Sequence, residues 1–114
     1  MYGTVARLHV KAGHQEQLRQ LNEEWTQGRG AQVAGYVASY VFRPDTRPDE
    51  LVLVAIFQDR ASYRANAEDP EQDRWYRQLR EHLQADPEWT DGEVIFAGTR
   101  TVGWGQVPPP RPAG

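Results

Sequence analysis

The apolar run Leu51–Phe57 constrains the fold of this chain more than any other feature of its sequence. All seven residues of the run are apolar, and the stretch before it, 44–49, contains two prolines and two aspartates that are typical of a surface turn. An apolar run of this length predicts a strand that is buried on both faces. The sheet that contains this strand therefore needs cover on both sides.

The rest of the chain supplies the partners of that strand. Residues 2–10 alternate so that one face is clearly apolar, which predicts a second strand. Leu18, Leu21 and Trp25 recur at helical spacing. The predicted elements in chain order are a strand over 2–10, a helix over 14–27, strands over 33–43 and 51–57, a helix over 60–68 that restarts at Asp69-Pro70, and a last strand over Val94–Ala97 after a turn at Asp91-Gly92.

This order of elements, β-α-β-β-α-β, is the split βαβ unit of the ferredoxin-like α+β fold. It predicts a four-stranded antiparallel sheet with helices on one face. Both faces of the strands 33–43 and 51–57 carry apolar or aromatic residues, so the face without helices would expose a large apolar patch. We expect a second copy of the chain to cover this patch, sheet against sheet, in a homodimer. The alternative cover is the C-terminal segment of the same chain.

The chain of 114 residues is long enough for one domain. We assign residues 1–98 to that domain and 99–114 to a C-terminal tail in which Gly and Pro dominate. A segment of this composition is expected to be extended rather than packed.

Composition and charge exclude several classes of partner. The net charge is −3 and basic residues form no block, so neither nucleic acid nor an anionic membrane surface is an expected partner. No apolar run approaches the length of a membrane span. The N-terminus has no basic segment followed by an apolar stretch, so we expect no signal peptide and a cytoplasmic location.

Metal and thiol chemistry are not expected either. The sequence contains no Cys, which excludes disulfides, thiol catalysis and Cys-ligated metals. His9, His14 and His82 lack the spacing that is expected of a metal site.

The segment that begins at the end of the apolar run carries a recognisable pattern. Phe57 leads into a helix with the sequence Tyr63-Arg64-Ala65-Asn66, and Asp69-Pro70 and Leu79-Arg80-Glu81 follow. This pattern resembles the antibiotic-biosynthesis monooxygenase family, and with the first strand and helix the resemblance covers residues 2–97. It implies a dimeric α+β barrel with a pocket between each sheet and its own helices.

One branch of that family oxidises polycyclic phenols with molecular oxygen and uses neither flavin nor metal. Its catalytic Tyr and Arg fall on Tyr63 and Arg80 of this chain, although Arg77 competes for the second position. Its Asn and Trp on the third strand fall on Leu53 and Phe57, so these two polar positions have become apolar. The resemblance therefore implies catalytic roles for Tyr63 and Arg80 and no cofactor.

A second branch degrades heme. Its Asn, Trp and axial His fall near Ala6, Asn66 and Tyr76, and none of the three matches. Heme is therefore not an expected ligand.

The spacing of residues along these elements brings an apolar floor and a few polar groups towards one volume, as in most ligand sites. The residues predicted to line this pocket are Leu53, Phe57, Tyr63, Asn66, Tyr76 and Arg80. Such walls favour a small apolar or aromatic ligand with one or two hydroxyl or carbonyl groups. Two functions remain open, namely a cofactor-independent monooxygenase and a non-catalytic dimer that binds a small ligand or serves as an interaction module.

Overall fold

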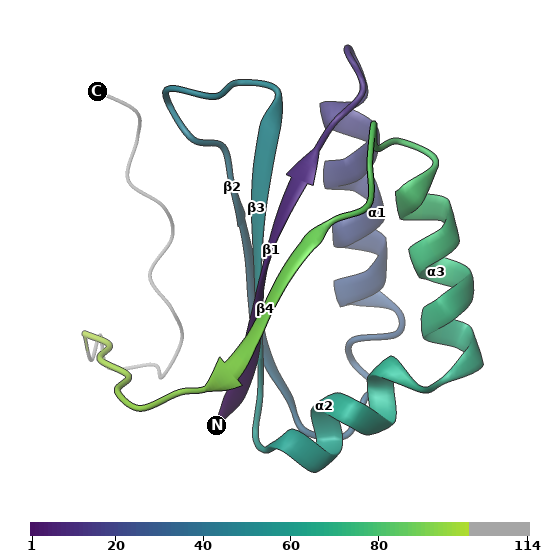
Figure 1. The fold of residues 1–114 in the computed structure, drawn as a ribbon. Coiled ribbons are helices and arrows are strands. Elements are labelled where there is room, and N and C mark those ends of the chain that lie inside the picture. The colour runs from purple at the N-terminus through teal and green to yellow at the C-terminus, as the bar shows by residue number, and fades with distance from the viewer. Residues whose placement is uncertain (101–114) are drawn as a thin grey trace.

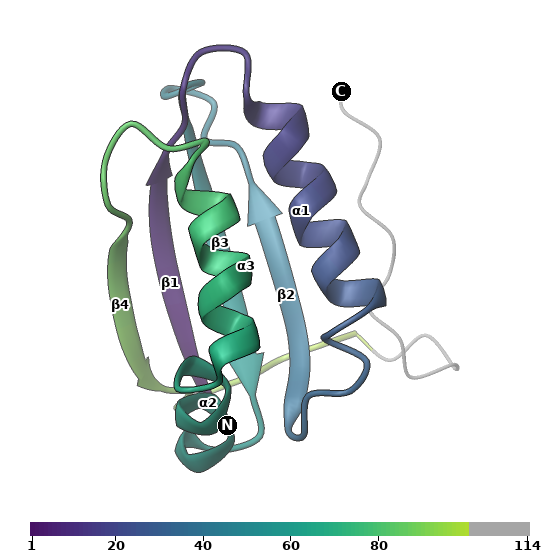
Figure 2. The same ribbon diagram turned by 90° about the vertical axis from the view of Figure 1, so that its right-hand side faces the viewer.

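The computed structural model of the protein describes residues 1–100, so most of the predicted tail lies outside the described residues. The elements are β1 (Tyr2–His9), α1 (Gln15–Gln27), β2 (Tyr36–Phe42), β3 (Glu50–Phe57), α2 (Arg60–Ala67), α3 (Pro70–Arg80) and β4 (Glu88–Glu93). The strands form one antiparallel sheet in the order β2-β3-β1-β4. This confirms the predicted ferredoxin-like α+β fold. The helices lie on one side of the sheet (Figures 1 and 2).

The register between the two central strands separates the faces of the sheet. Thr4 pairs with Ala55 and Ala6 pairs with Leu53 on the helix side. The intervening pair, Val5 with Val54, lies on the opposite side because successive residues of a strand point to opposite faces. We call this opposite side the open face of the sheet.

A cluster of leucines holds the helices onto one end of the sheet. The cluster, which we call the leucine core, consists of Leu8, Leu18, Leu51, Leu79 and Leu83, all at most 5% exposed. Burying each of these side chains contributes about 2 kcal/mol. Leu8 lies near the end of β1 and pairs with Leu51 near the start of β3. Leu18 lies near the start of α1, Leu79 near the end of α3 and Leu83 just after it. All five therefore occupy the same end of the molecule.

Two aspartates begin the second and third helices, as the sequence predicts. The Asp59 side chain accepts a hydrogen bond from the backbone N–H of Ser62, and the Ser62 hydroxyl completes a capping box. Asp69 caps α3, in which Pro70 takes the first position. These caps fix where α2 and α3 begin.

The predicted last strand is wrong in position. The observed strand is Glu88–Glu93, whereas Ile95 and Phe96 of the predicted strand Val94–Ala97 are 95% and 85% exposed. An edge strand needs only one pairing partner and tolerates polar residues, so hydrophobicity is a poor guide to it. The expected turn at Asp91-Gly92 is instead extended and pairs with β1. The second strand is also shorter than predicted, 36–42 rather than 33–43.

The open face of the sheet remains partly exposed in the single chain. Val5, Tyr40 and Phe42 are 41%, 44% and 52% exposed, and Val54 is half-buried. The apolar run on β3 is therefore more deeply buried on its helix side, where Leu51, Leu53 and Phe57 are at most 7% exposed. Within residues 1–100, no helix is both long enough and apolar enough to cross a membrane.

Gly35 should tolerate substitution poorly. Its φ is +83°, and an added Cβ would overlap the Oγ of Ser62. Gly35→Ala should therefore lower the free energy of unfolding by about 2–3 kcal/mol in urea denaturation. Gly13 has a φ of +80° with open space around it, so Gly13→Ala should cost only about 1 kcal/mol. Equal losses in the two variants would contradict the close contact with Ser62.

Candidate functional site

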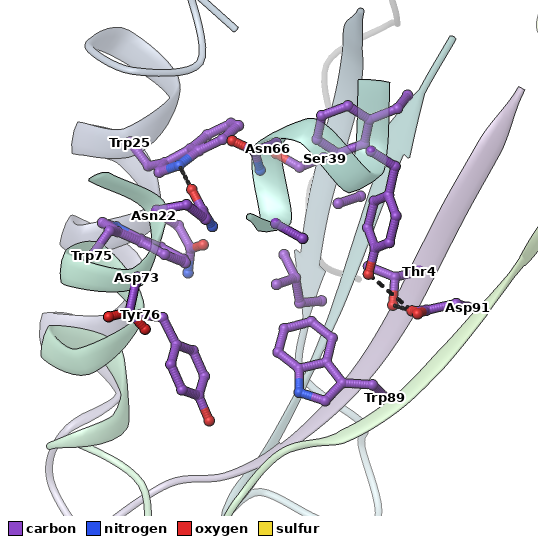
Figure 3. A pocket seen from close by; sticks show the side chains of 16 residues that line it. Thr4, Asn22, Trp25, Ser39, Asn66, Asp73, Trp75, Tyr76, Trp89 and Asp91 are labelled. Atoms are coloured by element: carbon purple, nitrogen blue, oxygen red, sulfur yellow. Dashed lines mark hydrogen bonds between the residues drawn. The ribbon is translucent and has the colours of Figure 1, made fainter. Parts of the chain in front are cut away.

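A cavity of about 530 Å³ lies between the helices and the sheet, beside the leucine core (Figure 3). Its lining comes from all three helices and all four strands. The lining residues are Thr4, Asn22, Trp25, Ser39, Leu53, Ala55, Phe57, Tyr63, Asn66, Ala67, Gln72, Asp73, Trp75, Tyr76, Trp89 and Asp91.

The size of the side chains explains why the cavity exists. On the sheet, Thr4, Ala55 and Ser39 are small and leave the floor low. On the helices, Trp25 and Trp75 form tall walls, with their ring centroids 6.2 Å apart. The small side chains of the sheet cannot fill the space between the sheet and the helices that carry these tryptophans. A cavity therefore remains where the leucine core ends.

Two strands and one helix meet in a polar cluster at the sheet side of the cavity. The Tyr63 hydroxyl donates to Asp91 Oδ1 at 3.0 Å, and the Thr4 hydroxyl donates to the same oxygen at 2.6 Å. The second carboxylate oxygen, Asp91 Oδ2, has no hydrogen-bond partner in the part of the chain that the structure describes. We call Thr4, Tyr63 and Asp91 the carboxylate cluster.

The surroundings of Tyr63 keep its hydroxyl protonated. Its ring packs between Tyr2 and Phe57, with centroid distances of 5.2 Å and 5.5 Å. Burial, together with the hydrogen bond to Asp91 and the negative charge of Asp91, raises the pKa of Tyr63 to about 12. Burial also raises the pKa of Tyr76. Both phenols are therefore hydrogen-bond donors at neutral pH and not bases.

A second polar network lies at the helix side of the cavity. Arg29 Nη2 donates to Asn66 Oδ1 at 2.7 Å, and Arg29 Nε donates to Gln72 Oε1 at 3.2 Å. Trp25 Nε1 donates to the same Gln72 oxygen at 2.8 Å. This network joins the segment after α1 to α2 and α3.

The structure brings together five of the six residues that the sequence predicted for the pocket. Leu53, Phe57, Tyr63, Asn66 and Tyr76 all line the cavity. Their roles in binding or catalysis stay predictions.

Arg80 is not part of the lining. It is the last residue of α3, and its guanidinium donates to the carbonyl of Leu83 at 3.0 Å and to Asp86 at 2.8 Å. The competing residue Arg77 is not part of the lining either; its side chain is 76% exposed and pairs with Asp73 at 2.8 Å. The predicted placement of Arg80 in the pocket is therefore wrong, because the chain after α3 supplies nearer acceptors.

Asp91 and Trp89 are among the lining residues that sequence reasoning missed. Both lie on β4, a strand that was predicted at 94–97. The alternation of Trp89 with Asp91 could have indicated a strand with one face towards the pocket. The Asp-Gly pair at 91–92, typical of turns, obscured that signal.

The structure also brings two distant histidines together outside the cavity. His14 Nδ1 and His82 Nδ1 are 2.9 Å apart, in hydrogen-bond contact. No group of three or more His, Asp or Glu side chains within residues 1–100 has an arrangement that could hold a metal ion.

Tyr63 should give the protein a distinctive loss of stability at high pH. Its raised pKa favours the protonated phenol in the folded state, so this contribution is present below pH 10 and lost as the pH rises through about 12. The wild type should therefore lose more stability than Tyr63→Phe across this range, as measured by urea denaturation. Tyr40→Phe, which removes a hydroxyl from the open face, is the control. A Tyr63→Phe curve parallel to that of the wild type would contradict the assignment.

A sequence model of the family described as antibiotic biosynthesis monooxygenase matches residues 1–78. No curated protein matches the chain in sequence.

Solved structures with the same fold cover nearly the whole described chain. One, named as a candidate antibiotic biosynthesis monooxygenase of Deinococcus radiodurans, is 20% identical, with a TM-score of 0.71 over 89% of this chain and 99% of that one. Rv0793 of Mycobacterium tuberculosis is 16% identical, with a TM-score of 0.71 over 86% and 98%. SnoaB of Streptomyces nogalater, a cofactor-independent oxygenase, is 18% identical, with a TM-score of 0.68 over 90% and 96%. At these identities the similarity shows the shared fold.

Proposed function

Because the chain belongs to the antibiotic biosynthesis monooxygenase family, we propose that it oxidises a small hydroxylated aromatic compound with molecular oxygen and without a bound cofactor. The observation that carries this proposal is the carboxylate cluster at the edge of a cavity with aromatic walls. The similarity to SnoaB, a cofactor-independent oxygenase of the same fold, supports it.

The reaction needs little from the protein beyond binding and proton transfer. A phenol that has lost its proton passes one electron to oxygen, and the resulting radical and superoxide join at a ring carbon. Loss of water from that peroxide leaves a quinone. One oxygen atom of O2 becomes the new carbonyl, and the other leaves in water with two hydrogens of the substrate.

Asp91 is the group that we assign to the first proton transfer. Its Oδ1 is occupied by Tyr63 and Thr4, which hold the carboxylate in place, and its Oδ2 is the oxygen that accepts the substrate proton. Tyr63 remains protonated and gives its single hydroxyl hydrogen to Asp91, so its role is to orient that carboxylate.

The aromatic walls supply the remaining requirement, which is an apolar surface for the ring of the substrate. Tyr76 on α3 and Trp89 on β4 face each other across the cavity, with their ring centroids 6.4 Å apart. Leu53 and Phe57 provide an apolar floor. A planar aromatic ring can pack against such surfaces.

Oxygen consumption tests the proposal directly. A panel of naphthols, anthrols and hydroquinones should include a compound that consumes oxygen in an electrode cell with no added cofactor. Tyr63→Phe and Asp91→Asn should each slow that reaction about 10²-fold, the usual effect of losing one acid–base or electrostatic group. Wild-type rates in both variants would remove the carboxylate cluster from the mechanism.

Arg80→Ala is the comparison variant for this experiment. The resemblance assigns Arg80 a catalytic role, whereas its side chain pairs with Asp86 outside the cavity lining. From this contact we expect Arg80→Ala to turn over within a few-fold of the wild type. A slowdown as large as that of Tyr63→Phe would return Arg80 to the catalytic group.

A second candidate function is binding without catalysis. Leu53 and Phe57 stand where the resemblance implies a polar Asn and Trp, which favours a site that holds a ligand without reacting with it. In that case no compound of the panel would consume oxygen, while several would raise the melting temperature.

We also infer that the chain works as a homodimer that packs through the open face of the sheet. Val5, Tyr40 and Phe42 are 41%, 44% and 52% exposed, and they adjoin half-buried residues of β3 in one apolar surface. Soluble proteins rarely leave a surface of this kind uncovered. A second copy, which carries the same surface, is a partner of matching chemistry.

Val54→Asp should disrupt this association. Val54 lies at the centre of the open face, paired with Val5 on one side and Tyr40 on the other. A charge buried there without a partner should weaken the dimer by roughly 3 kcal/mol or more. Size exclusion with light scattering at micromolar concentration should give a dimer for the wild type and a monomer for the variant. A wild-type mass of one chain would contradict the proposal.

A further inference from the structure

Asn66 is the most deeply buried polar side chain of the cavity after Thr4, with 9% of its surface exposed. Its Oδ1 accepts a hydrogen bond from Arg29 at 2.7 Å. A guanidinium can only donate, so this contact requires the amide oxygen to face Arg29 and the NH2 group to face away. Within residues 1–100, Asn66 Nδ2 has no hydrogen-bond partner, and the cavity is the space beside it.

Arg29 is itself held in place by several contacts. Besides Asn66, it donates to Gln72 at 3.2 Å and pairs with Asp69 at 3.4 Å, and its side chain is only 22% exposed. Gln72 is fixed in turn by Trp25. The orientation of the Asn66 amide therefore depends on a network and not on one flexible contact.

We propose that Asn66 Nδ2 is a specificity-determining donor that selects ligands with a carbonyl oxygen, and that Arg29 is the positioning residue that points this donor into the cavity. This inference rests on the proposed function only in that it takes the cavity to be the ligand site. Asn66 lies among the helical residues and Asp91 on the strand side (Figure 3). A ligand therefore forms hydrogen bonds at two places, from its hydroxyl to Asp91 and from Asn66 to its carbonyl.

The physical reason for selection is the unpaired donor. A ligand without an acceptor would cover the Asn66 NH2 group and leave it without any hydrogen bond, which is unfavourable. A carbonyl at the same place satisfies it. One such contact corresponds to an affinity ratio of about 10-fold.

The test compares two ligands that share one frame, 2-hydroxyanthraquinone and 2-hydroxyanthracene, of which only the first has carbonyl groups. Their dissociation constants are measured by quenching of tryptophan fluorescence, since Trp25, Trp75 and Trp89 line the cavity. At about pH 6 the hydroxyl of each ligand is protonated. The wild type should prefer the quinone about 10-fold.

Three variants test the roles of the two residues. Asn66→Asp keeps an acceptor for Arg29 but loses the donor, so the preference should vanish or reverse. Arg29→Met frees the amide to rotate and should lower the preference, and Arg29→Lys should restore part of it. Arg74→Met is the matched control, because Arg74 pairs with Glu71 and is not among the lining residues. It should leave the preference unchanged.

The ratio of the two affinities separates specificity from general damage. A wild-type ratio near one would overturn the inference, as would variants that weaken both ligands equally. Oxygen consumption is recorded separately. If the wild type prefers the quinone as expected but no compound of the phenol panel consumes oxygen, the oxygenase function fails and this inference stands. Turnover with an affinity ratio near one would support the oxygenase function and overturn the role of Asn66. Failure of both ligands to bind would also overturn the inference.

Discussion

The leucine core is the interaction on which the rest of this structure depends. Its almost completely buried side chains pack α1 and α3 against one end of the sheet. Beyond the leucine core, the small residues Thr4 and Ala55 of the sheet lie opposite Trp25 and Trp75 of the helices. Their side chains do not fill the space between the two layers. The cavity is therefore a consequence of packing at one end and of a change in side-chain size at the other.

The polar groups of the cavity are divided between its two sides. The carboxylate of Asp91 lies on the edge strand with Tyr63 and Thr4 as donors, and the amide of Asn66 lies at the helices with Arg29 behind it. One side thus offers an acceptor and the other a donor. Because Tyr63 stays protonated, Asp91 Oδ2 is the acceptor that a phenolic hydroxyl would meet in the carboxylate cluster.

Much of the fold followed from local patterns in the sequence. The continuous apolar run predicted β3, the alternation of residues 2–10 predicted β1, and Asp59 and Asp69-Pro70 predicted the starts of α2 and α3. The last strand did not follow, since β4 is polar along most of its length and is stabilised by pairing with β1. Pairing is a long-range interaction that no local pattern encodes.

For the site, the sequence by itself determined which face of each element points inward, and so it brought Leu53, Phe57, Tyr63, Asn66 and Tyr76 towards one space. These positions follow from the periods of strands and helices. Only the tertiary structure decided which polar atoms meet there. Arg80 turned to Asp86 beyond the end of its helix, and Asp91 reached Tyr63 from 28 residues along the chain. The physical reason is that hydrogen bonds of side chains depend on ångström distances between separate elements, whereas periodicity fixes only the direction in which a residue points.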